Sequence, residues 1–302
     1  MGARKELECF FGFMTMRKIK EFIIEKLILI CGLASIFFVA LIFLFLLKEG
    51  LSVFKTVLPV KFLFGKSWYP ISEPAQLGIL PLILGSLLIT FGAAVISIPV
   101  GVACAVYIAE IAPARTKEIL KAGIELLAAI PSVVLGFIGM ITLVPWVKNT
   151  FHLPTGLTAL SGSIMLAFMA MPTIVSIAED ALYSVPKTYK EGALALGATH
   201  WQAIYRVILP AASSGILAAV MLGIGRVIGE TMAVMMITGN SAVIPQSILQ
   251  PVRTLTATIA AEMGEAVVGS EHYFALFAIG IVLFIMSFAI NVTADLFLHK
   301  KN

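Results

Sequence analysis

The chain has 302 residues, of which 60% are hydrophobic and 13% charged, and its mean hydropathy is +1.02. This composition is far more apolar than a soluble domain needs, so it predicts an integral membrane protein. The formal net charge of +4 is modest and spread over loops, which argues against a nucleic-acid-binding surface.

The residue types that hold metals or form disulfides lack the usual spacings. Cys9, Cys31 and Cys104 form no C-x-x-C pair, and two of them lie in apolar segments. The four histidines show no metal-ligand spacing either. The sequence therefore predicts neither a disulfide framework nor a zinc site.

The first 26 residues form a basic arm that we expect to stay in the cytoplasm. An apolar patch at 9–14 could lie along the membrane surface, or belong to a disordered or locally packed tail. Residues 27–47 are predicted to be a retained first span, because they are longer than a signal-peptide core and no small-residue cleavage site follows. In the next loop, Trp68 and Tyr69 are aromatic residues of the kind that settle at the outer membrane interface.

The second and third spans are predicted at 78–109 and 123–147. The former is too long for one straight crossing, so Pro81 and Pro99 are expected to kink it or open it locally. A short basic loop separates the two spans.

The remaining spans are predicted at 160–183, 211–237 and 273–298. An outer segment with helical character at 254–268 carries Glu262 and Glu265. These carboxylates could belong to an outer gate or docking surface, or simply to a solvated face.

We therefore divide the chain into four parts. They are the arm (1–26), the first span with its outer loop (27–77), a core with five further spans (78–298) and a short tail (299–302). In this layout 14 of the 21 Lys and Arg residues lie on the side that holds both termini and the loop 187–210. The positive-inside rule places that side in the cytoplasm.

The stretch 187–210, KTYKEGALALGATHWQAIYRVILP, is a polar-rich interruption between apolar segments. Its first half holds good helix formers and ends at Gly197, a common C-terminal stop. A second helix is predicted after Thr199, because Thr199 and Gln202 have the spacing of a capping box, and this run ends at Pro210. The sequence therefore predicts two short helices between two spans.

This stretch resembles the coupling loop of ABC importer permeases, which has the pattern E-A-A, three residues, G, nine residues, I-x-L-P. The matching positions are Glu191, Gly192, Ala193, Gly197, Leu209 and Pro210. Gly192 replaces the usual Ala and Val207 the usual Ile. The resemblance implies an all-α, type I importer permease with six transmembrane helices, whose loop docks into a groove of a separate ATPase subunit. An ordinary amphipathic connector is the alternative.

Two ionisable residues lie within the predicted fifth span. Arg226 and Glu230 are four residues apart, so a continuous helix would let them meet as an ion pair. A charge at mid-membrane costs roughly 2.5 to 3.5 kcal/mol, so such a pair must face a polar cavity or the bundle interior. Arg offers a permanently charged fork that suits an oxyanion. A buried pair that only fixes helix orientation is the alternative.

The motif R-x-x-G-E-T-M-A-V at 226–234 is similar to span five of phosphate-specific importer permeases of the PstC type. The resemblance implies that Arg226 and Glu230 take part in anion passage, and we include Thr231 of the same motif. Ser132 is a further candidate, since its hydroxyl could face a passing anion or bond to a neighbouring helix.

Other polar residues near the spans are weaker candidates. Glu125, Glu179 and Asp180 fall near the cytoplasmic ends of spans, where contact with the basic loops or the ATPase is expected more than pathway lining. Ser86 and Thr90 have the same ambiguity as Ser132.

The resemblance implies a permease subunit that takes inorganic phosphate from an external binding protein into the cytoplasm by alternating access. Its implied partners are a second permease of the PstA type, two ATPase subunits, the binding protein and membrane lipid, in a prokaryotic inner membrane. The chain is not expected to be an enzyme or to hold a cofactor, because ATP and Mg would bind to the ATPase partners. The residues alone indicate only an anion. A permease for sulfate, molybdate or phosphonate is an alternative, as is a secondary anion transporter.

Overall fold

The computed structural model describes the backbone of residues 2–299 and the side chains of 21–293 and 296. The chain divides into two compact units, residues 1–49 and 50–302. Apart from one short hairpin, the described secondary structure is helical. Five helices are long and apolar enough to cross a membrane, or six if one bent pair counts as a span, within the part that the structure describes. The predicted all-α polytopic fold is confirmed.

The first unit consists of helix α1 (Gly2–Gly50), whose last residue begins the second unit. The predicted span 27–47 lies inside this helix, and the apolar stretch extends over Glu21–Lys55. Large apolar side chains such as Ile28 and Phe37 recur along it, which fits a membrane-spanning helix. The backbone has no break between the basic arm and the span, since it is helical from Gly2.

The second unit begins with short elements that lead into the core. A 3₁₀ turn η1 (Leu51–Lys55) and helix α2 (Pro59–Phe64) precede strands β1 (Trp68–Tyr69) and β2 (Gln76–Leu77). The strands pair antiparallel with Trp68 opposite Leu77. The expected position of Trp68 and Tyr69 at the outer membrane interface stays a prediction. The Trp68 side chain is only 2% exposed and faces the protein interior. It packs among the buried residues around Phe62 and Ile79.

Helix α3 (Leu80–Val106) continues into a π-helical turn, η2 (Tyr107–Ile111), and confirms the predicted second span. Pro81 does not kink it, because this proline lies in the first turn, where its missing N–H costs nothing. Pro99 does lie inside the helix.

The predicted third span is wrong at its start. Helix α4 (Ala114–Ala129) ends before Pro131, and helix α5 (Ser132–Thr150) is the apolar helix. The physical reason is Pro131, because a proline disfavours helical geometry in the preceding residue, and Ile130 is extended (φ −69°, ψ 127°).

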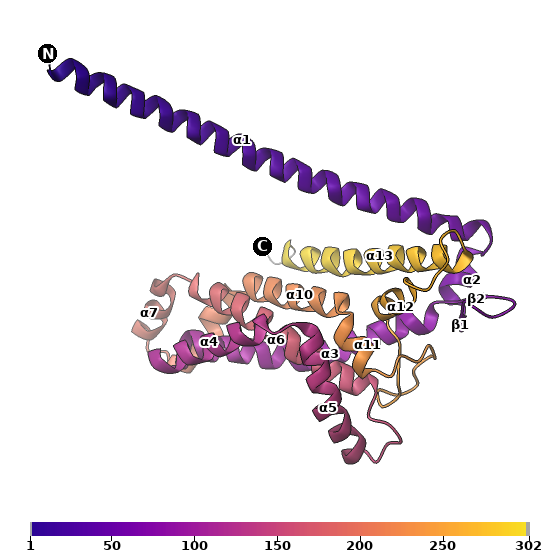
Figure 1. Ribbon diagram of the computed structural model, residues 1–302. Coiled ribbons are helices and arrows are strands. Elements are labelled where there is room, and N and C mark those ends of the chain that lie inside the picture. Colours follow the sequence, from indigo (N-terminus) through magenta and orange to yellow (C-terminus); the bar gives the residue numbers. More distant parts are fainter. Residues whose placement is uncertain (1, 300–302) are drawn as a thin grey trace. The chain divides into compact units, whose positions relative to one another are not determined.

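Helix α6 (Ala159–Tyr183) confirms the predicted fourth span and is the most buried of the candidate spans. The Thr158 side chain caps it by accepting the Ser161 N–H. It packs against α3 closely, since a Cβ added at Gly92 would lie 2.4 Å from the Ser163 hydroxyl oxygen. It also packs against α10 (Ser213–Gly229), so α6 is the central helix of this unit (Figure 1).

The loop 187–210 folds as predicted into short helices. They are α7 (Lys187–Ala195), α8 (His200–Ala203), a π-helical turn η3 (Ile204–Ile208) and α9 (Leu209–Ala211). Thr199 and Gln202 form the complete capping box. Gly197 ends the first part with φ of +85°, a conformation that a side chain would disfavour.

The predicted fifth span is interrupted. Helix α10 ends at Gly229, and a separate helix α11 (Met232–Ile237) follows. The segment His200–Ala211 meets α10 at 69°. Helix α12 (Leu255–Glu262) confirms the helical character of 254–268, and α13 (Glu271–His299) confirms the sixth span.

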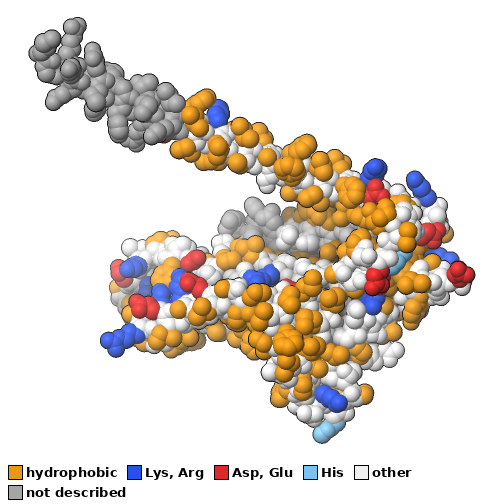
Figure 2. Space-filling view, viewed as in Figure 1, with side chains coloured by type: hydrophobic (Ala, Val, Ile, Leu, Met, Phe, Trp, Pro, Cys, Tyr) orange, Lys and Arg blue, Asp and Glu red, His pale blue; other side chains and the backbone are white. Residues whose placement is uncertain are grey.

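Within the second unit, α7 lies at one end and α12 with the strands lies at the other (Figure 1). Buried clusters run between these ends: one around Ile108 and Ile208, one around Ile89 and Ala167, and one around Leu255. On the face in Figure 2, charged side chains gather at the ends of this unit, while the surface between them is largely hydrophobic.

Candidate functional site

The interruption after α10 is the most unusual backbone feature among the predicted pathway residues. Glu230 is extended (φ −68°, ψ 131°) and Thr231 also leaves helical geometry (φ −120°, ψ −58°). The predicted ion pair between Arg226 and Glu230 is therefore wrong. A spacing of four residues brings side chains together only on a continuous helix, and this helix stops between them.

Local hydrogen bonds satisfy the polar groups at this break. The Glu230 carboxylate accepts the Ala233 N–H at 3.3 Å, and so caps the start of α11. The Thr231 hydroxyl donates to the Gly229 carbonyl at 3.1 Å. The Thr256 hydroxyl, from α12, donates to the Glu230 carbonyl at 2.9 Å. The break is thus a structured element with a tertiary contact.

Arg226 lies one turn before the break, and its side chain is exposed. Its guanidinium donates to the Thr173 hydroxyl of α6 at 3.3 Å. No carboxylate lies within 4.0 Å of it among the side chains that the structure describes. Arg226 therefore presents a permanent positive charge that an anion could approach. Thr173 was not predicted from the sequence, since it lies 53 residues away.

Ser132 lies on a helix that packs against α11, but the structure does not bring its side chain to the other predicted pathway residues. Ser132 is half-buried and begins α5, which packs against α11. The approach is close one turn later, where a Cβ on Gly136 would lie 3.0 Å from the Ala233 Cα. The described contacts include no hydrogen bond from Ser132 to Arg226, Glu230 or Thr231.

The loop 187–210 lies at the opposite end of the unit from the strands (Figure 1). Lys190 of α7 pairs with Glu110 of η2, and His200 Nε2 lies 3.3 Å from the Glu110 carbonyl oxygen. A cavity of about 220 Å³ lies beside this contact and is lined by residues that include Tyr183 and Glu191. The two parts of the loop are therefore both fastened to the end of the α3 helix. The sequence offered no signal for this contact.

Glu179 confirms the expectation that carboxylates near this end contact the basic loops. It is only 1% exposed, and Lys117 and Lys121 of α4 lie 3.8 Å and 3.6 Å from its Oε1 atom. Lys117 also lies over the Tyr183 ring, 3.6 Å from the centroid. Glu179 thus joins α4 to α6. Ser86 is likewise structural, because its hydroxyl accepts the Leu255 N–H at 3.0 Å.

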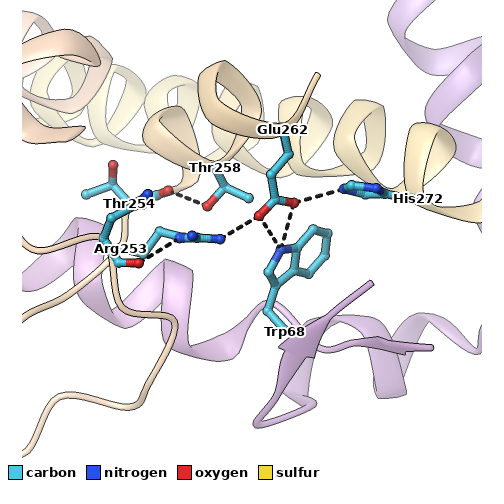
Figure 3. Close-up of polar contacts among 7 residues, drawn as sticks. Trp68, Arg253, Thr254, Thr258, Glu262 and His272 are labelled. Carbon is cyan, nitrogen blue, oxygen red and sulfur yellow. Dashed lines mark hydrogen bonds and ion pairs between the residues drawn. The ribbon is translucent and has the colours of Figure 1, made fainter. Parts of the chain in front are cut away.

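Glu262 is the centre of a polar cluster at the end of α12 (Figure 3). Its carboxylate accepts the Trp68 indole N–H, with N–O distances of 3.2 and 3.1 Å, and pairs with Arg253. His272 Nε2 lies 2.9 Å from the other carboxylate oxygen. Glu262 is therefore not a solvated surface residue, whereas the sequence left that reading open. No group of three or more His, Cys, Asp or Glu side chains could hold a metal ion in the part of the chain that is described.

Residues 97–301 match the family described as "Binding-protein-dependent transport system inner membrane component". The chain belongs to this family of ABC transporter permeases. This permease is 41% identical over 274 residues to the "Probable ABC transporter permease protein YqgH" of Bacillus subtilis (strain 168), covering 90% of this chain and 89% of that protein. It is 35% identical over 258 residues to the "Phosphate transport system permease protein PstC" of Mesorhizobium japonicum, covering 79% and 78% of the two chains.

Solved structures support the fold. This permease is similar to a chain of a bacterial alginate ABC transporter, solved with an alginate-bound periplasmic protein, with a TM-score of 0.62 and 16% identity over 88% of this chain and 92% of that one. It is also similar to a chain of the inward-facing MetNI methionine transporter, with a TM-score of 0.60 and 18% identity over 77% of this chain and all of that one.

Membership of the family confirms that the chain is a membrane-embedded transport subunit that works with partner proteins. Permeases of binding-protein-dependent importers are multi-pass inner-membrane subunits that pair with ATPases and a periplasmic binding protein. The chain is accordingly a transport subunit and not an enzyme. A secondary transporter, which needs no ATPase, does not fit this family.

Proposed function

We propose that this permease carries inorganic phosphate toward the cytoplasm, and that Arg226 and Glu230 lie on the pathway. The observation that carries the proposal is the exposed Arg226 guanidinium, which meets a hydroxyl and no carboxylate among the described side chains. A guanidinium fork that is not neutralised suits the oxygens of a tetrahedral anion.

Glu230 would limit how tightly the anion binds. Its carboxylate accepts a hydrogen bond at the start of α11 and does not pair with Arg226. Arg226 therefore keeps its attraction for an anion, while the negative charge of Glu230 lies only four residues further along the chain. Conduction needs binding that is weak enough for release, and repulsion from Glu230 supplies that limit. Thr231 and Ser132 would contribute hydroxyls along the same route.

Phosphate is supported by relatives and not by geometry. Several relatives that share about a third of their residues with this chain are named phosphate transport permeases of the PstC type. The Bacillus subtilis relative has a name that states no substrate. Another oxyanion, such as sulfate, molybdate or phosphonate, is therefore the second candidate.

The end that holds α7 is proposed to face the cytoplasm, because the span layout predicted from the sequence puts 14 of the 21 Lys and Arg residues on the same side of the membrane as the loop 187–210. Apolar side chains are exposed there with no cover: Tyr189, Leu194, Leu196, Trp201 and Tyr205. Such a surface marks a docking site, and we assign it to an ATPase subunit. ATP and Mg would bind to two such subunits, and a PstA-type permease would complete the pore.

The test is uptake of radiolabelled phosphate, with sulfate as the comparison, in vesicles that contain the complete importer. Arg226→Gln and Glu230→Gln are compared with Lys148→Gln, which removes an exposed charge at the end of α5. Loss of a charge-assisted contact of about 1.5 to 3 kcal/mol predicts at least a tenfold loss of phosphate uptake in Arg226→Gln. The Lys148→Gln control should transport at the parent's rate.

Each outcome has a separate meaning. If both pathway variants assemble and carry phosphate like the parent, Arg226 and Glu230 have structural roles and the pathway assignment is wrong. If the parent takes up sulfate in place of phosphate, the transport mechanism stands and the proposed cargo changes.

A further inference from the structure

A groove of about 970 Å³ lies at the end of the second unit that holds α12. Its lining comes from three segments: the hairpin from Trp68 to Ser72, residues 240–243 with Arg253, and the end of α12 with the chain that follows it. Glu262 lies in this lining and contacts side chains from each of the three segments (Figure 3).

The Glu262 cluster fastens these segments together. Trp68 comes from β1, Arg253 from the chain before α12, and His272 from the first turn of α13. The side chains of Arg253, Glu262 and His272 are only 14% to 19% exposed, so water screens these contacts weakly. A displacement of Trp68, Arg253 or His272 in the groove therefore also moves Glu262, the last residue of α12.

The other end of α12 is fastened to the core. Thr254 caps the helix by accepting the Ala257 N–H at 3.2 Å, and the Leu255 N–H donates to Ser86 of α3 at 3.0 Å. The Thr256 hydroxyl, which is 6% exposed, donates to the carbonyl of Glu230 at 2.9 Å. The first turn of α12 thus holds the break in span five.

Helix geometry connects these two ends. Thr256 and Glu262 are six residues apart on one uninterrupted helix, which corresponds to about 9 Å along its axis. A helix this short moves as a rigid body, so a displacement of its end at the groove reaches the Glu230 carbonyl.

We propose that α12 is the connector through which events at this groove change the pathway at Glu230, with Glu262 and Thr256 as its positioning residues. When the external binding protein engages this end of the permease, the Glu262 cluster shifts, and Thr256 displaces the backbone at the break. The inference rests on the proposed function, since it needs Glu230 to lie on the pathway.

The experiment uses the complete importer in proteoliposomes, with its partner permease, ATPase subunits and binding protein. The measured quantity is the ratio of ATPase activity with binding protein to activity without it. Thr256→Val removes the hydroxyl that reaches Glu230, and Glu262→Gln removes the charge at the cluster. Each should lower the ratio at least about fivefold, the lower range of typical coupling between sites.

Two control variants match these changes in chemistry. Thr258→Val removes a hydroxyl on the same helix that donates only to the Thr254 carbonyl of the preceding turn, at 2.8 Å. Glu271→Gln removes an exposed carboxylate in the first turn of α13 that does not line the groove. Both controls should keep the parent's ratio.

The double variant Thr256→Val, Glu262→Gln should lower the ratio no further than the worse single variant, because both changes break one connection. A parent-like ratio in Thr256→Val and Glu262→Gln would overturn the connector. This includes the case in which basal and stimulated ATPase activity fall by the same factor, because the ratio is then unchanged and only stability has been lost. Arg226→Gln in the same vesicles tests the proposed pathway separately. If this variant and Glu230→Gln both carry phosphate normally, the pathway is wrong whatever the α12 variants do.

Discussion

Lys190 of the loop 187–210 forms an ion pair with Glu110, which lies in the π-helical turn at the end of α3. The loop is therefore fastened to the second span as well as continuous with the fifth. Because α3 packs along the central helix α6, a displacement of the loop has a direct route into the middle of the unit.

On the proposed function, breaking this pair should reduce the amount of phosphate carried per ATP hydrolysed. The side chains of Lys190 and Glu110 are 30% and 13% exposed, so Glu110→Gln should weaken the attachment by only about 1 kcal/mol, and the ATPase subunits should still bind. Uptake and hydrolysis measured on the same vesicles give the ratio. The exchange Glu110→Lys with Lys190→Glu should restore part of it, and a double exchange no better than either single variant would contradict the role of the pair.

Removing both lysines that face the buried Glu179 carboxylate should destabilise the protein more than removing the carboxylate's charge. Removing Lys117 and Lys121 together, each to Ala, leaves a buried carboxylate without compensation and should cost about 3 to 5 kcal/mol in the free energy of unfolding. Either lysine change alone should cost much less, because the other lysine remains. Thermal unfolding of the purified importer measures this difference. If Glu179→Gln is more damaging than the double lysine change, the explanation is wrong.

Thr173 should affect transport through Arg226. Thr173→Val removes the hydroxyl that accepts from the guanidinium, which is worth about 1 kcal/mol, or about fivefold in apparent affinity. We expect a higher KM for phosphate with little change in the maximal rate of uptake. Thr142→Val is the matched control, since that exposed hydroxyl bonds only to the Ile138 carbonyl of its own helix. A parent-like KM in Thr173→Val would show that Arg226 needs no support from α6.

Trp68→Phe should destabilise the end of the unit that holds α12. The substitution keeps an aromatic ring but removes the indole N–H that reaches the Glu262 carboxylate, and losing this charge-assisted bond should cost about 1.5 to 3 kcal/mol in the free energy of unfolding. Trp146→Phe serves as a control, because Trp146 of α5 is 57% exposed. Equal stability of the two variants would mean that the indole contact contributes nothing.

Local chemistry made the coupling loop predictable from the sequence. Gly197 and the capping box of Thr199 and Gln202 act within a few residues, so their geometry follows from the sequence itself. The extended backbone at Glu230 has only a weak signal: Gly229 ends α10, but a single glycine within an apolar helical run does not by itself predict a break. The contact between Trp68 and Glu262 joins residues 194 positions apart, and only the fold brings them together. The family resemblance suggested the proposed pathway residues Arg226 and Glu230, while their partners Thr173 and Thr256 required the structure.

The bond from Thr256 ends on the main-chain carbonyl of residue 230 and not on its carboxylate. On the proposed pathway, a different side chain at this position would change the charge that the anion meets, yet would leave the backbone attachment to α12 in place. In this proposal, selectivity and mechanical linkage are thus carried by different atoms of the same residue. A related permease with another side chain at this position would then differ in the anion that it transports, while the hydrogen bond between α12 and the backbone would be unchanged.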